Sequence, residues 1–186
     1  MKTKHLSALL VTGTMAALAS PVMADSADVP ELNFSCQITE GIPTTVAQPA
    51  GSEVRQPIFH WRDDAIAYLS SSTPQQMCDG VAAKLEEYSN QGYDLSKINF
   101  IGTEQAGLPV ICANTAGSPE CSKVLLTLTP IEQAANVADR VVSEILDESL
   151  KQQKQVVASN KRGVQSTSYQ VDFWSLLGLN LKFFGK

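Results

Sequence analysis

Alternation of apolar and polar residues marks the first regular part of the chain. Leu32, Phe34, Cys36 and Ile38 are separated by single polar residues, which is the period of a strand with one buried face. Glycine and proline at positions 41 and 43 indicate a turn, and the β-branched run at residues 44–47 can pair back on that strand. Residues 58–61 form a third short strand, so this part of the chain predicts three strands.

A helix is predicted over residues 73–92. Thr73 is a suitable N-cap, Pro74 occupies the first helical position, and Gln76 completes a T-x-x-Q capping box. Glycine at position 92 is a common residue just after the end of a helix. The apolar stripe on its buried face would consist of Met77, Val81, Leu85 and Tyr88.

Three further apolar runs of strand length follow at residues 98–102, 108–113 and 124–128. A second capping box, Thr129-Pro130-Ile131-Glu132, predicts that a long helix begins at Pro130. Residues 156–170 are polar and lose the periodicity, so they are interpreted as a linker. The apolar face of the long helix would carry Val137, Val141, Ile145 and, if it extends that far, Leu150.

Together these elements predict an α+β domain over residues 25–155. Its mostly antiparallel sheet is packed by two helices in the order βββ-α-βββ-α. The residues expected in the core are Phe34, Ile58, Trp61, Val81, Leu85, Ile111, Leu126, Val141 and Ile145.

The last segment, residues 171–186, is apolar and rich in aromatic side chains. As a helix it would be too short to span a bilayer, since twelve residues rise only about 18 Å. It could dock on the domain, lie in a membrane interface or bind a protein partner. The residues predicted to contact a membrane or partner are Phe173, Trp174, Leu177, Leu181 and Phe184.

Residues 1–24 have the pattern of a secretory signal peptide. Lys2 and Lys4 precede a short apolar run, and small residues at positions 22 and 24 suit cleavage after Ala24. An uncleaved anchor is the alternative. We therefore expect export, to the periplasm or the thylakoid lumen, with association to a membrane left open.

Composition narrows the class of partner. Cleavage removes two lysines, leaving 12 basic and 19 acidic residues, a formal charge of 12 − 19 = −7. An acidic surface disfavours nucleic acid as a partner and weakens attraction to anionic lipid. The sequence predicts no organic cofactor.

His60 is the one histidine that remains after cleavage, and it precedes a polar cluster. One hypothesis is a small hydrolase in which His60 is a general base supported by Asp63 or Asp64. A second is calcium binding by Asp63 and Asp64, although the chain has no EF-hand loop. The third is a strand residue followed by a solvated charged turn. Because no nucleophile motif accompanies His60, a non-catalytic role is favoured.

Several blocks of sequence carry a family resemblance. They are Phe34-Ser35-Cys36, Gly41-Ile42-Pro43-Thr44-Thr45, Ile58-Phe59-His60-Trp61, Thr73-Pro74 with Cys78, Leu108-Pro109-Val110-Ile111-Cys112, Cys121, and Leu125-Leu126-Thr127-Leu128. In order and spacing the chain resembles the cyanobacterial circadian-oscillating protein family over about residues 32–146. The resemblance implies a cyanobacterial source, export, peripheral membrane association and calcium association, and it implies no known reaction.

Four cysteines after an export signal predict two disulfides. Cys112 and Cys121 flank a loop between two predicted strands, which favours a bond between them. Cys36 on the first strand would then pair with Cys78 on the first helix. Free thiols and a zinc site are the alternatives, and the spacing does not favour zinc.

Overall fold

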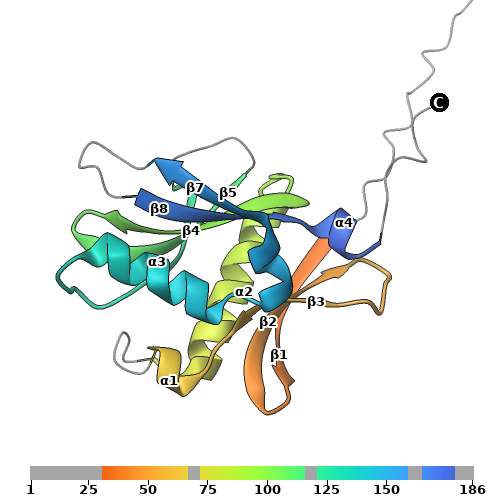
Figure 1. Cartoon of the computed structure of the whole chain (residues 1–186). Helices are drawn as coiled ribbons and strands as arrows, with labels where there is room; N and C mark the ends of the chain where they lie inside the picture. The colour runs from red at the N-terminus through yellow and green to blue at the C-terminus, as the bar shows by residue number, and fades with distance from the viewer. Residues whose placement is uncertain (1–30, 67–71, 116–120, 159–164, 179–186) are drawn as a thin grey trace, which may run out of the picture.

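The part of the chain that the structure describes contains two antiparallel sheets and two principal helices. The computed structural model describes residues 31–66, 72–115, 121–158 and 165–178. One sheet has three strands in the order β1-β2-β3, and the other has five in the order β6-β5-β4-β8-β7. Figure 1 shows the two sheets at different ends of the molecule, with helix α3 lying along one face of the larger sheet. The predicted α+β fold is confirmed, although the strands form two sheets and not one.

The smaller sheet is a hairpin extended by one strand. Its strands are β1 (Leu32–Thr39), β2 (Ile42–Pro49) and β3 (Gln56–His60). The turn between β1 and β2 consists of Glu40 at φ 52° and Gly41 at φ 82°, a pair of left-handed residues that suits a two-residue hairpin. All three predicted strands are therefore present.

Helix α2 (Pro74–Asn90) follows the sequence prediction closely. The Thr73 side chain accepts from the Gln76 backbone N–H, and the Gln76 side chain accepts from the Thr73 backbone N–H, which completes the capping box. The helix packs on β1 and β2, and a disulfide between Cys36 and Cys78 joins it to β1. A short helix that the sequence did not predict, α1 (Asp63–Ile66), precedes it.

The larger sheet begins with three predicted strands. They are β4 (Lys97–Gln105), β5 (Leu108–Thr115) and β6 (Lys123–Thr127). A disulfide between Cys112 and Cys121 joins β5 to the residues just before β6. Both predicted disulfides are confirmed.

Helix α3 (Ala134–Ile145) begins later than predicted. Thr129 and Glu132 form no capping box; the N-cap is Gln133, whose φ of 57° is left-handed and whose side chain makes no capping bond. The chain leaves the sheet edge at Leu128, where the backbone N–H still bonds to Pro109, and must then cross toward β4. Leu150 is buried but belongs to the separate 3-10 helix η1 (Glu148–Gln153).

The predicted linker at residues 156–170 is wrong as a description of local structure. Strands β7 (Lys154–Ala158) and β8 (Gln165–Asp172) take up most of it, and β8 pairs with both β4 and β7. Thr167 and Ser168 are buried in β8. The Asp139 carboxylate accepts from the Thr167 backbone N–H at 2.7 Å. Some buried positions of β8 are thus occupied by polar residues, and the strand lacks the apolar pattern by which strands are predicted from sequence.

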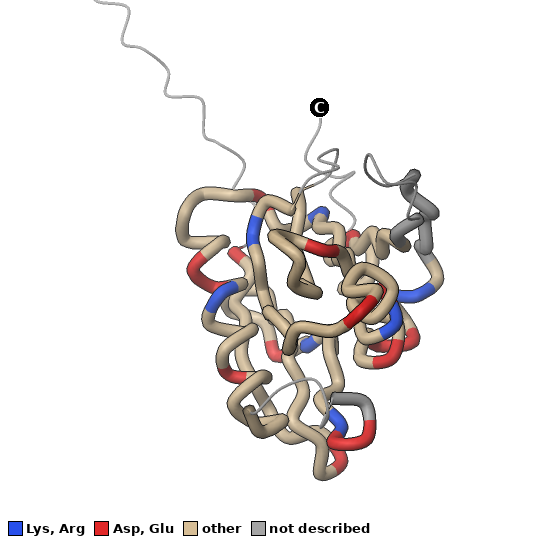
Figure 2. Tube along the Cα trace, turned by 90° about the vertical axis from the view of Figure 1, so that its left-hand side faces the viewer, with Lys and Arg blue, Asp and Glu red and all other residues tan. Residues whose placement is uncertain are grey.

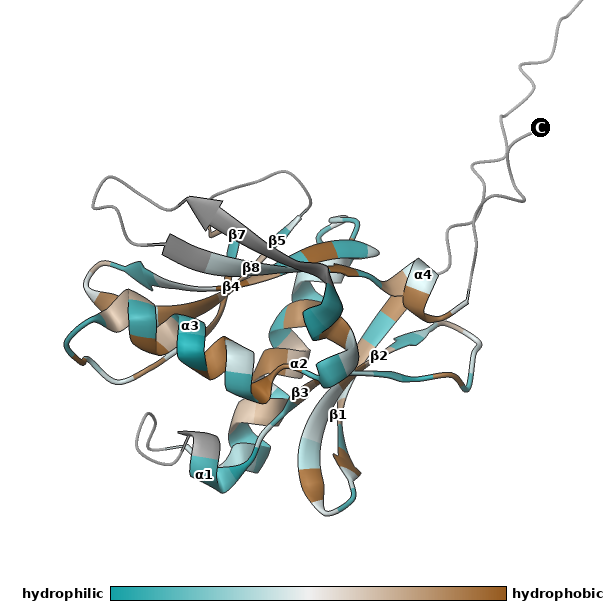
Figure 3. Ribbon diagram, viewed as in Figure 1, coloured by the Kyte–Doolittle hydropathy of each residue, from teal (hydrophilic) through white to brown (hydrophobic). Residues whose placement is uncertain are grey.

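One hydrophobic cluster spans both sheets. Phe59 on β3 contacts Phe100 on β4 edge to face, with ring centroids 4.8 Å apart. Figure 3 shows hydrophobic and hydrophilic positions alternating along α3, and the hydrophobic ones are buried. Of the predicted core residues, all but Leu126 are buried; Leu126 is partly buried, and its neighbour Leu125 is in the core. Among the described helices, none is long and apolar enough to cross a bilayer.

Gly102 on β4 lets helix α3 approach the larger sheet. A Cβ added there would lie 2.2 Å from the Ala138 carbonyl carbon and oxygen. Because both clashing atoms are backbone, a methyl group would push the helix off the sheet. We expect Gly102→Ala to lower the free energy of unfolding by about 2 kcal/mol or more, measured by urea denaturation.

Gly80 provides the matched control. It is exposed in α2, and a Cβ there would meet nothing within 4 Å. Gly80→Ala should raise the free energy of unfolding by roughly 0.5–1 kcal/mol, because alanine has the higher helix propensity. Equal effects of the two substitutions would contradict the proposed role of Gly102.

Candidate functional site

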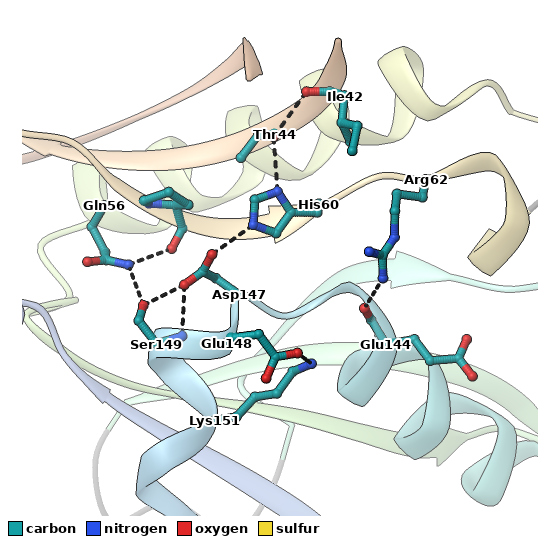
Figure 4. Close-up of polar contacts among 11 residues, drawn as sticks. Ile42, Thr44, Gln56, His60, Arg62, Glu144, Asp147, Glu148, Ser149 and Lys151 are labelled. Atoms are coloured by element: carbon teal, nitrogen blue, oxygen red, sulfur yellow. Dashed lines mark hydrogen bonds and ion pairs between the residues drawn. The ribbon is translucent and has the colours of Figure 1, made fainter. Parts of the chain in front are cut away.

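His60 contacts a different carboxylate from the one predicted. Its Nε2 lies 2.8 Å from Asp147 Oδ2, whereas Asp63 and Asp64 belong to α1. Figure 4 shows the His60 ring between Thr44 on β2 and Asp147 at the start of η1. The prediction of an Asp63 or Asp64 partner is therefore wrong, and the true partner is 87 residues away in sequence.

The Thr44 hydroxyl contacts His60, but its surroundings do not suit a nucleophile. Thr44 is completely buried, and its hydroxyl donates to the Ile42 carbonyl at 3.0 Å. The Thr44 hydroxyl oxygen also lies 3.3 Å from His60 Nδ1, and His60 Nε2 faces the Asp147 carboxylate. Both ring nitrogens therefore have partners inside the protein, and the Thr44 hydroxyl beside the ring is buried.

Asp147 is held by donors on both of its oxygens. The backbone N–H of Ser149 donates to Oδ1 at 2.9 Å, and the Ser149 hydroxyl donates to the same oxygen. Burial acts to raise the pKa of the Asp147 carboxyl, but the hydrogen bonds from Ser149 and His60 outweigh it. The pKa of Asp147 is consequently lowered from its ordinary value of 3.8.

Backbone contacts accompany this side-chain pair. The Asp147 N–H donates to the Ile58 carbonyl at 2.9 Å, and Phe59 forms an isolated antiparallel bridge with Leu146. We call these contacts, together with the hydrogen bond between His60 and Asp147, the β3 seam. It fastens the smaller sheet to the end of α3, which is a structural role for His60.

Asp63 and Asp64 are both exposed in the first turn of α1. The Asp64 side chain is 85% exposed and lies 4.0 Å from Arg62 Nε. Within the described ranges, no group of three or more histidine, cysteine, aspartate or glutamate residues is placed to hold a metal ion. Calcium binding by Asp63 and Asp64 stays a prediction. Figure 2 shows acidic and basic positions interspersed along the trace.

The aromatic residues of the C-terminal segment are partly internal. Phe173 and Trp174 begin the short helix α4 (Phe173–Leu176) and are 0% and 4% exposed. Phe173 packs on Phe34 with ring centroids 6.2 Å apart, and Leu177 is partly buried against the core. The proposed contacts of Phe173 and Trp174 with a membrane or partner do not fit this burial. Leu181 and Phe184 lie outside the described residues.

A groove of about 340 Å³ lies where the hairpin turn, the end of β3 and the start of α2 meet. It is lined by residues 41–43, 61–63 and 73–75, and we call it the hairpin–helix groove. No pattern in the sequence predicts this groove. Turn and cap residues at positions 41, 43, 73 and 74 were noted separately, but nothing in the sequence places them side by side.

The walls of the groove are tied together behind its surface. Trp61 Nε1 donates to Thr45 Oγ1 at 2.8 Å, and that hydroxyl contacts Cys78 Sγ at 3.7 Å. On the helix side, Gln75 Nε2 lies 3.3 Å from Cys36 Sγ. The Cys36–Cys78 disulfide therefore fixes the helix wall of the groove to the hairpin wall.

Comparison with known proteins places the chain in a family. The family model described as Circadian oscillating protein COP23 matches residues 33–178, which is more than half of the chain. The chain belongs to the COP23 family. No curated protein and no solved structure matches it. The COP23 match continues through β7, β8 and α4, beyond the residue range of the resemblance noted in the sequence.

The blocks that carry the COP23 resemblance divide between two places in the fold. Those at residues 41–45, 58–61 and 73–74 meet at the hairpin–helix groove, and the blocks with Cys36 and Cys78 form the disulfide beneath it. The other two blocks lie in the larger sheet. Residues 108–112 belong to β5, and residues 125–128 cover the end of β6 and the residue just after it. Three separate blocks thus contribute to the lining of this groove.

The lowered pKa of Asp147 predicts how acid affects stability. A carboxyl whose folded-state pKa lies below its unfolded-state value stabilises the fold at pH above that unfolded-state value, and the contribution is lost as the pH falls through the folded-state pKa. At pH 5 we expect Asp147→Asn to lower the free energy of unfolding by roughly 1–2 kcal/mol. The difference from wild type should shrink as the pH is lowered toward 2, measured by urea denaturation at each pH.

Asp64→Asn is the control for that experiment. Its carboxylate is far more exposed and its nearest cation is 4.0 Å away, so its removal should change stability by less than about 0.5 kcal/mol at every pH. A constant deficit of Asp147→Asn across the pH range would show that the loss does not depend on the charge of Asp147.

Proposed function

We propose that this COP23-family chain is an exported, non-catalytic binding protein whose contact surface is the hairpin–helix groove. In this proposal the groove replaces the aromatic residues Phe173 and Trp174 as the site of partner contact. The hydrolase alternative lacks support, because the hydroxyl in contact with His60 belongs to the fully buried Thr44 and is also hydrogen-bonded to the Ile42 carbonyl.

Export is supported by two independent features. Residues 1–24 have the composition of a signal peptide, and the four cysteines are all paired in disulfides. Disulfides persist in oxidising compartments and are rare in the cytosol. An exported protein of this kind can rely on Cys36–Cys78 to keep the groove in shape.

The observation that carries the proposal is the construction of the groove. A rigid hairpin turn, a buried tryptophan and a capped helix start are held together by a covalent bond, and the lining mixes apolar with polar residues. Ligand sites are typically concave, pre-formed and lined in this mixed way. The volume of about 340 Å³ is at the lower end of the range for such sites, which suits one anchoring segment of a partner.

We expect export to be accompanied by cleavage and oxidation. The full-length chain produced in a cyanobacterium should be recovered from an exported fraction with an N-terminus at Asp25 and with no thiol alkylated under denaturing, non-reducing conditions. Mass spectrometry of the intact protein measures both. Recovery from the cytosol with Met1 retained and free thiols would refute export.

We also expect the groove to be the part of the surface nearest to a partner. A photo-crosslinking amino acid placed at Gln75, which lines the groove, should yield a discrete higher-mass adduct in intact cells. The same amino acid at Gln105, exposed at the end of β4, is the control and should not yield that adduct. Equal crosslinking from both positions would count against the groove.

A further inference from the structure

We infer that the hairpin–helix groove binds a cationic peptide segment of a partner protein, anchored by one apolar side chain. This inference rests on the proposed function and adds the chemistry of the ligand. Two properties of the surface support it: an apolar strip that continues out of the groove, and an excess of carboxylates around it.

The apolar strip begins inside the groove and ends on the hairpin. Ile42, Pro43 and Pro74 line the groove, and Trp61 lies at its buried end with 1% exposure. Ile38 is paired with Pro43 across the hairpin, so both side chains leave the same face of the sheet. Ile38 is 61% exposed, the largest value among the exposed large hydrophobic residues described.

Carboxylates outnumber cations next to this strip. Asp63 lines the groove, Asp64 follows it, and Glu40 precedes the lining residue Gly41 in the hairpin turn; all three are exposed. The nearby cation is Arg62, whose Nη2 donates to the Glu144 carbonyl at 3.3 Å and whose Nε faces Asp64 at 4.0 Å. These four residues carry a formal charge of 1 − 3 = −2, which complements lysine or arginine on a ligand.

A peptide fits these features better than the other cationic or apolar ligands of a cell. The volume of the groove suits one side chain, while the exposed Ile38 outside it and Asp63 in its lining offer further apolar and charged contacts. A segment with an apolar residue flanked by basic residues would use all three. Anionic lipid headgroups and nucleic acid would meet repulsion from the same carboxylates.

Tryptophan fluorescence provides a direct measurement. The chain has two tryptophans, and Trp61 lines the groove while Trp174 is buried in α4. The Trp174 indole N–H has no hydrogen-bond partner in the described part of the chain, so Trp174→Phe removes no such bond. In that variant the emission of Trp61 alone reports on the groove.

The probe is a blocked nine-residue peptide with a central leucine flanked by lysines. We expect a saturable change of Trp61 emission at peptide concentrations below roughly 1 mM. The affinity for the peptide should fall as salt is raised from 50 to 500 mM. A peptide with glutamates in place of the lysines, and one with glycine in place of the leucine, should each bind at least fivefold more weakly. Calorimetry on the wild-type chain repeats the comparison without the tryptophan substitution.

Matched variants locate the binding. Ile38→Ser should weaken binding of the leucine peptide about tenfold, while Val54→Ser, at a 55% exposed position in the loop at the opposite end of the hairpin, should leave it unchanged. Asp63→Asn combined with Asp64→Asn should weaken it about two- to tenfold. Glu53→Gln combined with Glu132→Gln, which removes two exposed carboxylates elsewhere, should not.

Several results would overturn the inference. They are equal binding of the lysine and glutamate peptides, equal effects of Ile38→Ser and Val54→Ser, and absence of binding in both fluorescence and calorimetry. Binding of vesicles of phosphatidylglycerol in place of the peptide would identify a membrane ligand and also reject it. If the peptide fails while crosslinking from Gln75 persists, the groove remains a binding site and only the cationic peptide is excluded.

Discussion

The β3 seam joins the smaller sheet directly to the segment that follows α3, the helix that packs on the larger sheet. The bond from the Asp147 N–H to the Ile58 carbonyl and the bridge between Phe59 and Leu146 join two segments that are nearly ninety residues apart. His60, on the same strand, adds a hydrogen bond to the Asp147 carboxylate, and the Phe59 ring reaches Phe100 in the other sheet. Trp61, which follows directly, is thereby fixed as the buried end of the hairpin–helix groove.

The two disulfides act on different parts of this arrangement. Chain-entropy estimates give about 4 kcal/mol for closing the 42-residue separation of Cys36 and Cys78, and about 3 kcal/mol for the 9-residue separation of Cys112 and Cys121. The longer one also joins a strand to a helix at the groove, while the shorter one stays within the larger sheet. Reduction of the longer bond would therefore affect both the stability of the fold and the shape of the groove.

Sequence patterns predicted an element correctly where interactions between neighbouring residues determine it. The capping box at Thr73 begins α2 because its bonds stay within one turn. The similar pattern at Thr129 fails, since Leu128 is still bonded to the sheet at Pro109 and the chain must cross two strand positions to bring Ala138 against Gly102. An extended segment covers about twice the distance per residue of a helix, so the helix starts only after the crossing. In β8, the buried residues Thr167, Tyr169 and Val171 do recur at every second position, as in a strand. Because Thr167 and most of the neighbouring residues are polar, this alternation is not recognisable from hydrophobicity alone.

Functional sites were less accessible to sequence analysis for the same physical reason. The partner of His60 is set by the β3 seam, and a carboxylate at position 147 is indistinguishable in sequence from Asp63 or Asp64. The groove likewise requires a turn, a strand end and a helix cap to converge, each of which has an ordinary structural purpose on its own. Its chemistry follows from that convergence: the hairpin register places Ile38 beside Pro43, and the first residue of α1, Asp63, lines the same groove. An apolar strip bordered by negative charge is a property of the assembled surface, and it is this combination that selects a basic segment with an apolar anchor over a purely charged or purely apolar ligand.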